Sequence, residues 1–152
     1  MAIDLILVDD HEIFRKGLAL QLQELDSMNV VGEAASGEEF LKLIEDTSAD
    51  IVLMDIKMSG ITGVEATERA LKIKPDLKIV ALSMFGEEEY LQNMLDIGAK
   101  GFMLKNIPVN ELERALKLVM NGKSFFSDEL LSILTKTFMS GNAPDKDEKE
   151  VP

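Results

Sequence analysis

The chain contains no cysteine, so it forms neither disulfide bonds nor a thiolate metal site. No apolar run approaches the ~20 residues that cross a bilayer, and the N-terminal MAIDLILVDD lacks the basic segment of a signal peptide. Basic residues are also scarce: 16 Lys and Arg face 28 Asp and Glu, for a net charge of -12. Because nucleic-acid-binding surfaces are basic, the chain alone is not expected to bind nucleic acid. We therefore expect a cytoplasmic protein with no membrane contact.

Five short apolar runs alternate with helical patterns. With 46% hydrophobic residues, the 152-residue chain has enough apolar material for one domain and a tail. Apolar runs of this length are typical of strands buried on both faces. The runs cover residues 3–8, 29–35, 50–56, 78–84 and 101–105. Five successive β-α repeats predict an α/β fold, with a doubly wound parallel sheet of five strands.

Capping signals mark where helices begin. Ser36 with Glu39, and Thr62 with Glu65, have the spacing of capping boxes, in which a hydroxyl and a carboxylate accept hydrogen bonds from free backbone N–H groups. Helices are therefore expected to start just after Ser36 and Thr62.

The pattern changes after residue 122. Ser127 is a suitable N-cap, and apolar residues follow it at helical spacing, which predicts one extra helix within residues 123–140. Residues 141–152 are polar, charged and interrupted by Pro and Gly, which is typical of a disordered linker. A domain covering residues 1–122 is thus expected to precede a helix and a linker that leads to a further domain.

Charged and polar residues end four of the predicted strands. Asp9 and Asp10 end the first, Asp55 the third, Ser83 the fourth, and Lys105 the fifth. Ligands of open parallel sheets bind beyond the carboxyl ends of the strands. Three carboxylates, one hydroxyl and one ammonium are therefore expected to meet at one edge of the sheet.

These residue types suit a phosphate acceptor that uses Mg2+. Crowded carboxylates repel each other, and a hard divalent cation with oxygen ligands relieves that repulsion. An Asp beside such an ion is a plausible phosphoryl acceptor. Taken singly, Asp10 could be only a helix cap, Asp9 and Lys105 only an ion pair, and Ser83 only a loop hydroxyl. Asp55 is harder to explain in that way, because it ends the apolar run IVLMD, where a charge is costly.

The motifs resemble those of response-regulator receiver domains. They are LILVDDHE, IVLMDIKMSGITG, ALSMF and GFMLK, and the resemblance covers roughly residues 3–122. It implies a flavodoxin-like fold with strand order 2-1-3-4-5. Carried over by position, it makes Asp55 the phosphoacceptor. The metal ligands are then Asp10, Asp55 and the backbone carbonyl of Lys57, with Asp9 acting through water, while Lys105 pairs with the phosphoryl oxygens and Ser83 and Phe102 are the switch residues.

Three positions depart from the family pattern. Ser59 stands where Pro is usual, Asn106 instead of Pro follows Lys105, and the switching aromatic is Phe102 and not Tyr. None of these changes removes a predicted ligand. A cis peptide bond at 105–106 is left open, since a non-proline cis bond costs roughly 3 kcal/mol.

The segments FRKGL and LSMF, with the extra helix, resemble the NarL/FixJ-type (LuxR-like) subfamily. The resemblance implies a sensor histidine kinase as phosphate donor, a homodimer formed on phosphorylation, and control of transcription through a helix-turn-helix domain beyond Pro152. The signalling change would appear on the face built by helix 4, strand 5 and helix 5.

Two other functions compete with this hypothesis. A haloacid-dehalogenase-like phosphatase also uses an Asp nucleophile, but it needs a second acid at the position of Lys57. A pseudo-receiver would be expected to lack some of the acids or Lys105. His11, the only histidine, could be a phosphoryl relay or a metal ligand, but it is interpreted as an exposed first-turn residue next to Asp10 and is given no role. The side chain of Lys57 either tunes dephosphorylation or has no effect.

Overall fold

A single parallel sheet forms the centre of the molecule. The computed structural model describes residues 2–84, 86–127 and 132. The strands are β1 (Ile3–Val8), β2 (Met28–Ala34), β3 (Ile51–Asp55), β4 (Lys78–Ser83), β5 (Gly101–Leu104) and β6 (Phe125–Phe126). Their order in the sheet is β2-β1-β3-β4-β5-β6. The five predicted strands are confirmed to within one residue at either end.

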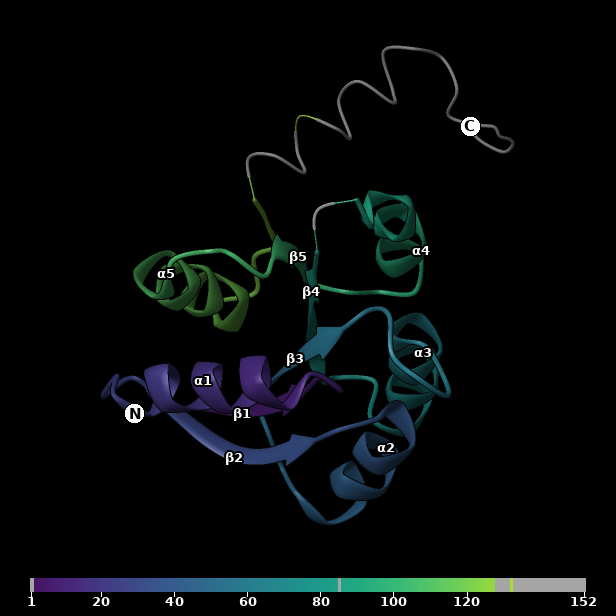
Figure 1. Ribbon diagram of the computed structural model, residues 1–152, viewed down its shortest axis with the longest axis horizontal. Helices are drawn as coiled ribbons and strands as arrows, with labels where there is room; N and C mark the ends of the chain where they lie inside the picture. Colours follow the sequence, from purple (N-terminus) through teal and green to yellow (C-terminus); the bar gives the residue numbers. More distant parts are fainter. Residues whose placement is uncertain (1, 85, 128–131, 133–152) are drawn as a thin grey trace.

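Helices cover both faces of the sheet. They are α1 (Glu12–Gln23), α2 (Gly37–Asp46), α3 (Gly63–Ile73), α4 (Leu91–Asp96, preceded by the 3-10 turn η1, Glu88–Tyr90) and α5 (Val109–Met120). Figure 1 shows α1 and α5 on one face and α2, α3 and α4 on the other. This arrangement confirms the doubly wound, flavodoxin-like fold.

The strands separate two apolar cores because successive side chains point to opposite faces. In β1, Ile6 and Val8 belong to the cluster under α2, α3 and α4, whereas Leu5 and Leu7 belong to the cluster under α1 and α5. All four are essentially buried. The apolar run from Leu5 to Val8 thus serves both cores, and Asp9 and Asp10 follow it where the strand reaches the carboxyl edge of the sheet.

Both predicted caps are present. The Ser36 hydroxyl accepts a hydrogen bond from the backbone N–H of Glu39 (3.0 Å), and the Thr62 hydroxyl accepts one from the backbone N–H of Glu65 (3.2 Å). The two helices begin at Gly37 and Gly63, as expected. The second start places α3 directly after the loop that follows Asp55.

The segment after α5 contains a strand that the sequence analysis did not predict. Phe125 and Phe126 form a sixth parallel strand, which pairs with Gly101 and Phe102. The first residues of the 123–140 segment are therefore not helical. Apart from residue 132, the rest of that segment and the whole of the predicted linker, 141–152, lie outside the described residues.

Two further expectations concern the described residues. Within this part of the chain no helix is long and apolar enough to cross a membrane. The same part contains no cis peptide bond, so the bond between Lys105 and Asn106 is trans.

Candidate phosphoacceptor site

Lys105 joins two of the acids at the carboxyl edge of the sheet. Asp9 directly follows β1, Asp55 ends β3, and Lys105 directly follows β5. The Lys105 ammonium lies 2.9 Å from Asp9 Oδ2 and 3.0 Å from Asp55 Oδ1. Asp55 is only 2% exposed and Asp9 4%. The two ion pairs are therefore shielded from water, which strengthens each contact but also makes it costly to keep the buried carboxylates ionised.

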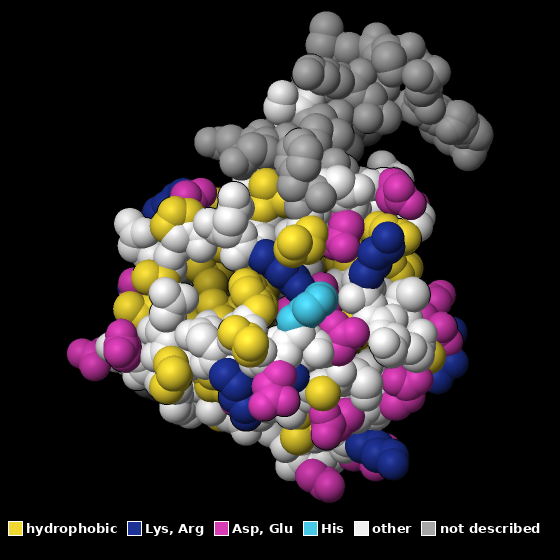
Figure 2. Space-filling model, in the orientation of Figure 1, with side chains coloured by type: hydrophobic (Ala, Val, Ile, Leu, Met, Phe, Trp, Pro, Cys, Tyr) yellow, Lys and Arg dark blue, Asp and Glu magenta, His cyan; other side chains and the backbone are white. Residues whose placement is uncertain are grey.

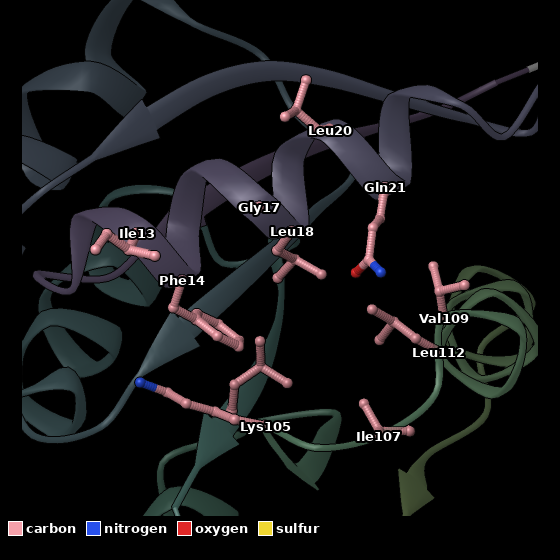
Figure 3. Close-up of a pocket in the computed structure, with 11 residues that line it drawn as sticks. Ile13, Phe14, Gly17, Leu18, Leu20, Gln21, Lys105, Ile107, Val109 and Leu112 are labelled. Carbon is pink, nitrogen blue, oxygen red and sulfur yellow. The ribbon is translucent and has the colours of Figure 1, made fainter.

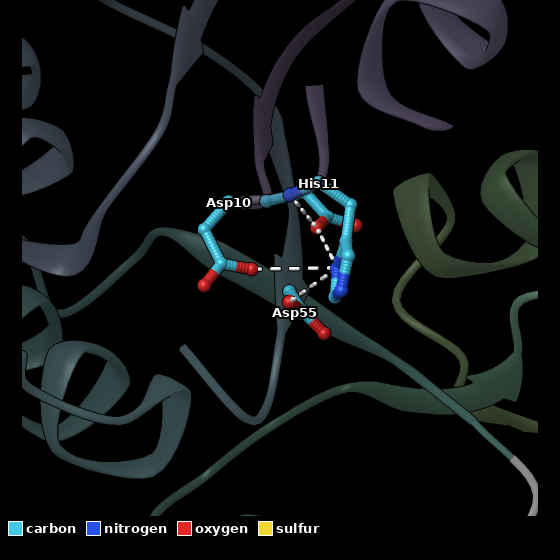
Figure 4. Close-up of side chains that lie close together, drawn as sticks. Asp10, His11 and Asp55 are labelled. Atoms are coloured by element: carbon cyan, nitrogen blue, oxygen red, sulfur yellow. Dashed lines mark hydrogen bonds and ion pairs between the residues drawn. The ribbon is translucent and has the colours of Figure 1, made fainter. Parts of the chain in front are cut away.

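The second carboxylate oxygens of Asp9 and Asp55 face the side chains of Asp10 and His11. His11 Nδ1 lies 3.0 Å from Asp9 Oδ1, 3.3 Å from Asp10 Oδ1 and 4.0 Å from Asp55 Oδ2 (Figure 4). One ligand atom from each of the four residues lies within 4.8 Å of the others. The predicted convergence of Asp9, Asp10 and Asp55 is thus present, and His11, to which the sequence analysis gave no role, lies with them.

Burial and neighbouring charges change the pKa values of Asp55 and Lys105. Burial, reinforced by the nearby charge of Asp9, raises the pKa of Asp55 to about 7, although Lys105 opposes the shift. Burial by itself would lower the pKa of Lys105, but the hydrogen bond to Asp9 and the charge of Asp55 raise it above its ordinary value. Lys105 is therefore cationic at neutral pH, while Asp55 takes up and releases a proton near neutrality in the absence of a metal.

An apolar hollow of about 430 Å³ between α1 and α5 lies next to Lys105 (Figure 3). The ammonium end of Lys105 points away from Ile107 and Val109, and its Nζ lies 5.0 Å from the centroid of the Phe14 ring. An aromatic face attracts a cation at this distance. Phe14 thus covers the ammonium from the α1 side and helps direct it toward the acids.

The other predicted residues lie around this centre. Ser83 ends β4 and is fully buried, and its hydroxyl has no hydrogen-bond partner among the described residues. Phe102 is fully buried in the core under α2, α3 and α4. The exposed Lys57 extends toward Tyr90, with its Nζ 6.0 Å from the ring centroid. The structure therefore brings neither the Phe102 ring nor the Lys57 ammonium into the group of acids.

Arg15 stabilises the backbone next to the candidate site, and the sequence analysis did not identify it. It is buried in α1, where its guanidinium donates to the backbone carbonyl of Asp9 (2.6 Å) and to Glu33 Oε1 on β2 (2.9 Å). A signal was available: Arg15 shares with Ala19 and Leu22 the spacing of the buried helix face. The residue fixes the backbone that carries the acid pair.

Replacing Arg15 by leucine is expected to lower the free energy of unfolding by about 2–3 kcal/mol, because the Asp9 carbonyl and the Glu33 carboxylate lose a buried charged donor. Lys16→Leu is the matched control. Its ammonium is 3.5 Å from the same Glu33 oxygen, but the side chain is 58% exposed, so a change within about 0.5 kcal/mol is expected. Urea unfolding followed by circular dichroism compares the two, and equal losses would contradict the role of Arg15.

The residues present fit a divalent metal ion. Asp55 Oδ2 is buried, without a hydrogen-bond partner among the described residues, and lies on the side where Asp10 and His11 stand. Three carboxylates and the single ammonium of Lys105 leave two negative charges. A hard divalent cation such as Mg2+ matches both that charge and the oxygen ligands.

Comparison with known proteins agrees with the fold. The family model of the response regulator receiver domain matches residues 5–117. Response regulator GacA of Pseudomonas syringae pv. syringae (strain B728a) is 40% identical over 128 residues, which cover 84% of this chain and 60% of that protein. The oxygen regulatory protein NreC of Staphylococcus carnosus (strain TM300) is 33% identical over 149 residues, which cover 97% of this chain and 69% of that protein.

Solved structures show the same architecture. A two-component response regulator of the LuxR family from Aurantimonas sp. SI85-9A1 superposes with a TM-score of 0.86 at 27% identity, covering 91% of this chain and 99% of that one. The signal receiver domain of the putative response regulator NarL from Mycobacterium tuberculosis gives a TM-score of 0.75 at 30% identity, covering 80% and 98%. The chain spans about 60% of the length of its GacA relatives. It belongs to the response regulator receiver domain family, in the NarL/FixJ-type group.

Proposed function

We propose that this chain is a phosphoacceptor switch that takes a phosphoryl group onto Asp55 from the phosphohistidine of a sensor kinase. The observation that carries the proposal is the Asp55 carboxylate itself. It is buried at the end of β3, one oxygen is paired with Lys105, and the other is free of hydrogen-bond partners among the described residues and faces Asp10 and His11. A buried carboxylate with one oxygen available is suited to act as a nucleophile.

In the transfer, Asp55 Oδ2 forms a bond to phosphorus while the bond from phosphorus to the kinase imidazole nitrogen breaks. The bonding pair stays on that nitrogen, which is the leaving group. Lys105, already 3.0 Å from Asp55 Oδ1, is placed to pair with the oxygens of the incoming group, and the buried Ser83 hydroxyl offers a further donor. Mg2+, when held by Asp10, Asp55 and the backbone carbonyl of Lys57 with Asp9 acting through water, neutralises negative charge on those oxygens.

The signal is proposed to leave through the face formed by α4, β5 and α5. Ser83 ends β4 next to β5, and its register partner there is Leu104. Movement of the Ser83 hydroxyl toward a phosphoryl group would loosen the packing around Phe102, which lies two residues before Leu104 on β5. A new charge at Asp55 thereby biases a packed element with two arrangements.

The output is proposed to be a homodimer and control of transcription through a DNA-binding domain outside this chain. This step rests on relatives that carry such names, among them a transcriptional regulatory protein, DegU, of Brevibacillus brevis. The net charge of -12 disfavours binding of this chain to the phosphates of DNA. The chain is therefore proposed to act on DNA only through the further domain and to catalyse only its own phosphorylation and dephosphorylation.

Acetyl phosphate tests the proposal directly. Incubation with Mg2+ is expected to add the mass of one phosphoryl group, seen by intact-protein mass spectrometry and removed by hydroxylamine. Asp55→Asn is expected to abolish the addition, while Asp50→Asn, which alters a partly exposed acid before the start of β3, is expected to leave it in place. Modification of Asp55→Asn to the same extent would overturn the proposal. Steady turnover of phosphate monoesters would instead favour a phosphatase, and a chain that gains no phosphate would be a pseudo-receiver.

A further inference from the structure

The only histidine of the chain lies at the mouth of the acidic group. His11 follows the acid pair directly and is the N-cap of α1. Its backbone N–H donates to Asp9 Oδ1 (2.8 Å), and its side chain is 65% exposed. Figure 2 shows this histidine at the surface, next to acidic and basic side chains. The imidazole therefore lies on the solvent-facing side of the group of acids.

Asp9 and Asp55 each have one carboxylate oxygen near Lys105 and the other near His11. Lys105 contacts Asp9 Oδ2 and Asp55 Oδ1, whereas His11 Nδ1 faces Asp9 Oδ1 and Asp55 Oδ2. Asp10 Oδ1 lies on the same side as the imidazole, 3.3 Å from Nδ1. Each buried carboxylate thus keeps one oxygen for a second cation, and the nitrogen is placed among those oxygens.

The spacing suits a four-coordinate ion. In a tetrahedral site with metal–ligand bonds of about 2.0–2.1 Å, neighbouring ligand atoms are about 3.3 Å apart. His11 Nδ1 is already 3.0 Å from Asp9 Oδ1 and 3.3 Å from Asp10 Oδ1, and 4.0 Å from Asp55 Oδ2. Of these three distances only the last has to close, by less than 1 Å, and the four ligand atoms all lie within 4.8 Å of one another. Asp55 Oδ2, 2% exposed as a residue and without a hydrogen-bond partner among the described residues, points into the same space.

We infer that His11 Nδ1, with the carboxylates of Asp9, Asp10 and Asp55, forms a binding site for a nitrogen-preferring divalent ion such as Zn2+, in competition with Mg2+. Imidazole is a good ligand for zinc and other late first-row ions, whereas Mg2+ takes oxygen ligands. The inference rests on the proposed function only because both involve the same carboxylates of Asp9, Asp10 and Asp55. Such an ion would occupy the oxygens that Mg2+ needs and so would block phosphorylation of Asp55.

The single histidine makes the test unambiguous. In the tag-free chain, a long-range proton–nitrogen NMR spectrum contains one imidazole, so Zn2+ is expected to shift the resonance of His11 Nδ1 and leave Nε2 less affected. His11→Gln is expected to lower the ratio of Zn2+ affinity to Mg2+ affinity by about tenfold or more in calorimetric titrations. Mg2+ in excess is expected to reverse the Nδ1 shift in the unaltered chain.

Two results would overturn the inference. One is an affinity ratio that stays the same in His11→Gln, and the other is Zn2+ binding without a shift of Nδ1, which would place the ion elsewhere. Both leave the proposed function intact if acetyl phosphate and Mg2+ still modify Asp55. Failure of Mg2+ to bind the unaltered chain, or of Asp55 to accept phosphate, would count against the proposed function instead.

Discussion

Asp55→Asn is expected to stabilise the metal-free protein at pH 8, by about 2–4 kcal/mol in the free energy of unfolding. The reason is the environment of the acid. Burial and the charge of Asp9 raise its pKa to about 7, against 3.8 for an unperturbed Asp. At pH 8 the folded protein must hold an ionised carboxylate that is only 2% exposed. Asparagine has a similar shape and carries no charge.

The gain is expected to shrink as the pH falls. Between pH 4 and 7 the folded unaltered protein keeps a proton on Asp55 that the unfolded chain has released. Each unit of rising pH therefore lowers the free energy of unfolding of the unaltered protein by about 1.4 kcal/mol at most, whereas the variant lacks this dependence. Above pH 7 both states are ionised and the effect is constant. Near pH 5 the unaltered protein has lost only a minor part of this free energy, so it and Asp55→Asn should differ little in stability.

Urea unfolding at pH 5, 7 and 8 without metal measures this dependence. Asp26→Asn, which removes the same charge from an exposed turn, controls for net charge and is expected to show no comparable gain. Mg2+ is expected to reverse the order at pH 8, because the proposed metal site loses a carboxylate ligand in the variant and a ligand stabilises the folded state in proportion to its affinity. An Asp55→Asn protein that is no more stable than the parent at pH 8, or whose gain is the same at pH 5, would contradict the account.

Much of the fold follows from local sequence patterns. The apolar runs place β1 to β5 to within one residue at either end, and Ser36 and Thr62 mark the starts of α2 and α3. These features depend on residues a few positions apart, so their signals lie within short windows. β6 has no such signal. Phe125 and Phe126 extend the sheet only because Gly101 and Phe102 lie beside them.

The candidate site also contains residues that the sequence predicts and residues that it does not. Acids at the ends of predicted strands could be placed together because parallel strands direct their carboxyl ends to one edge. The positions of His11 and Arg15 depend on how α1 is oriented on the sheet, which tertiary packing decides. Hence the sequence indicated which acids meet, but not that an imidazole lies among them or that a guanidinium fixes the backbone of Asp9.

Gly63 is another residue whose importance only the tertiary structure reveals. It lies where α3 begins against the end of β3 that carries Asp55. The Gly63 N–H donates to the carbonyl of Ile56 (2.7 Å). A Cβ at this position would lie 2.0 Å from the backbone oxygen of Asp55 and 2.8 Å from the Cα of Ile56. Both neighbours are backbone atoms, so no side-chain rotation relieves the contact.

Gly63→Ala is therefore expected to lower the free energy of unfolding by about 3 kcal/mol or more, since either α3 or the backbone of Asp55 has to move. Phosphorylation by acetyl phosphate should slow in the molecules that remain folded, because Asp55, the proposed acceptor, shifts relative to Lys105. Gly17→Ala is the matched control: Gly17 is also helical and has nothing within 4 Å of an added Cβ, so a gain of about 0.5–1 kcal/mol is expected. Urea unfolding compares the two, and a Gly63→Ala protein as stable as Gly17→Ala would show that the close approach of α3 to Asp55 does not constrain the acceptor.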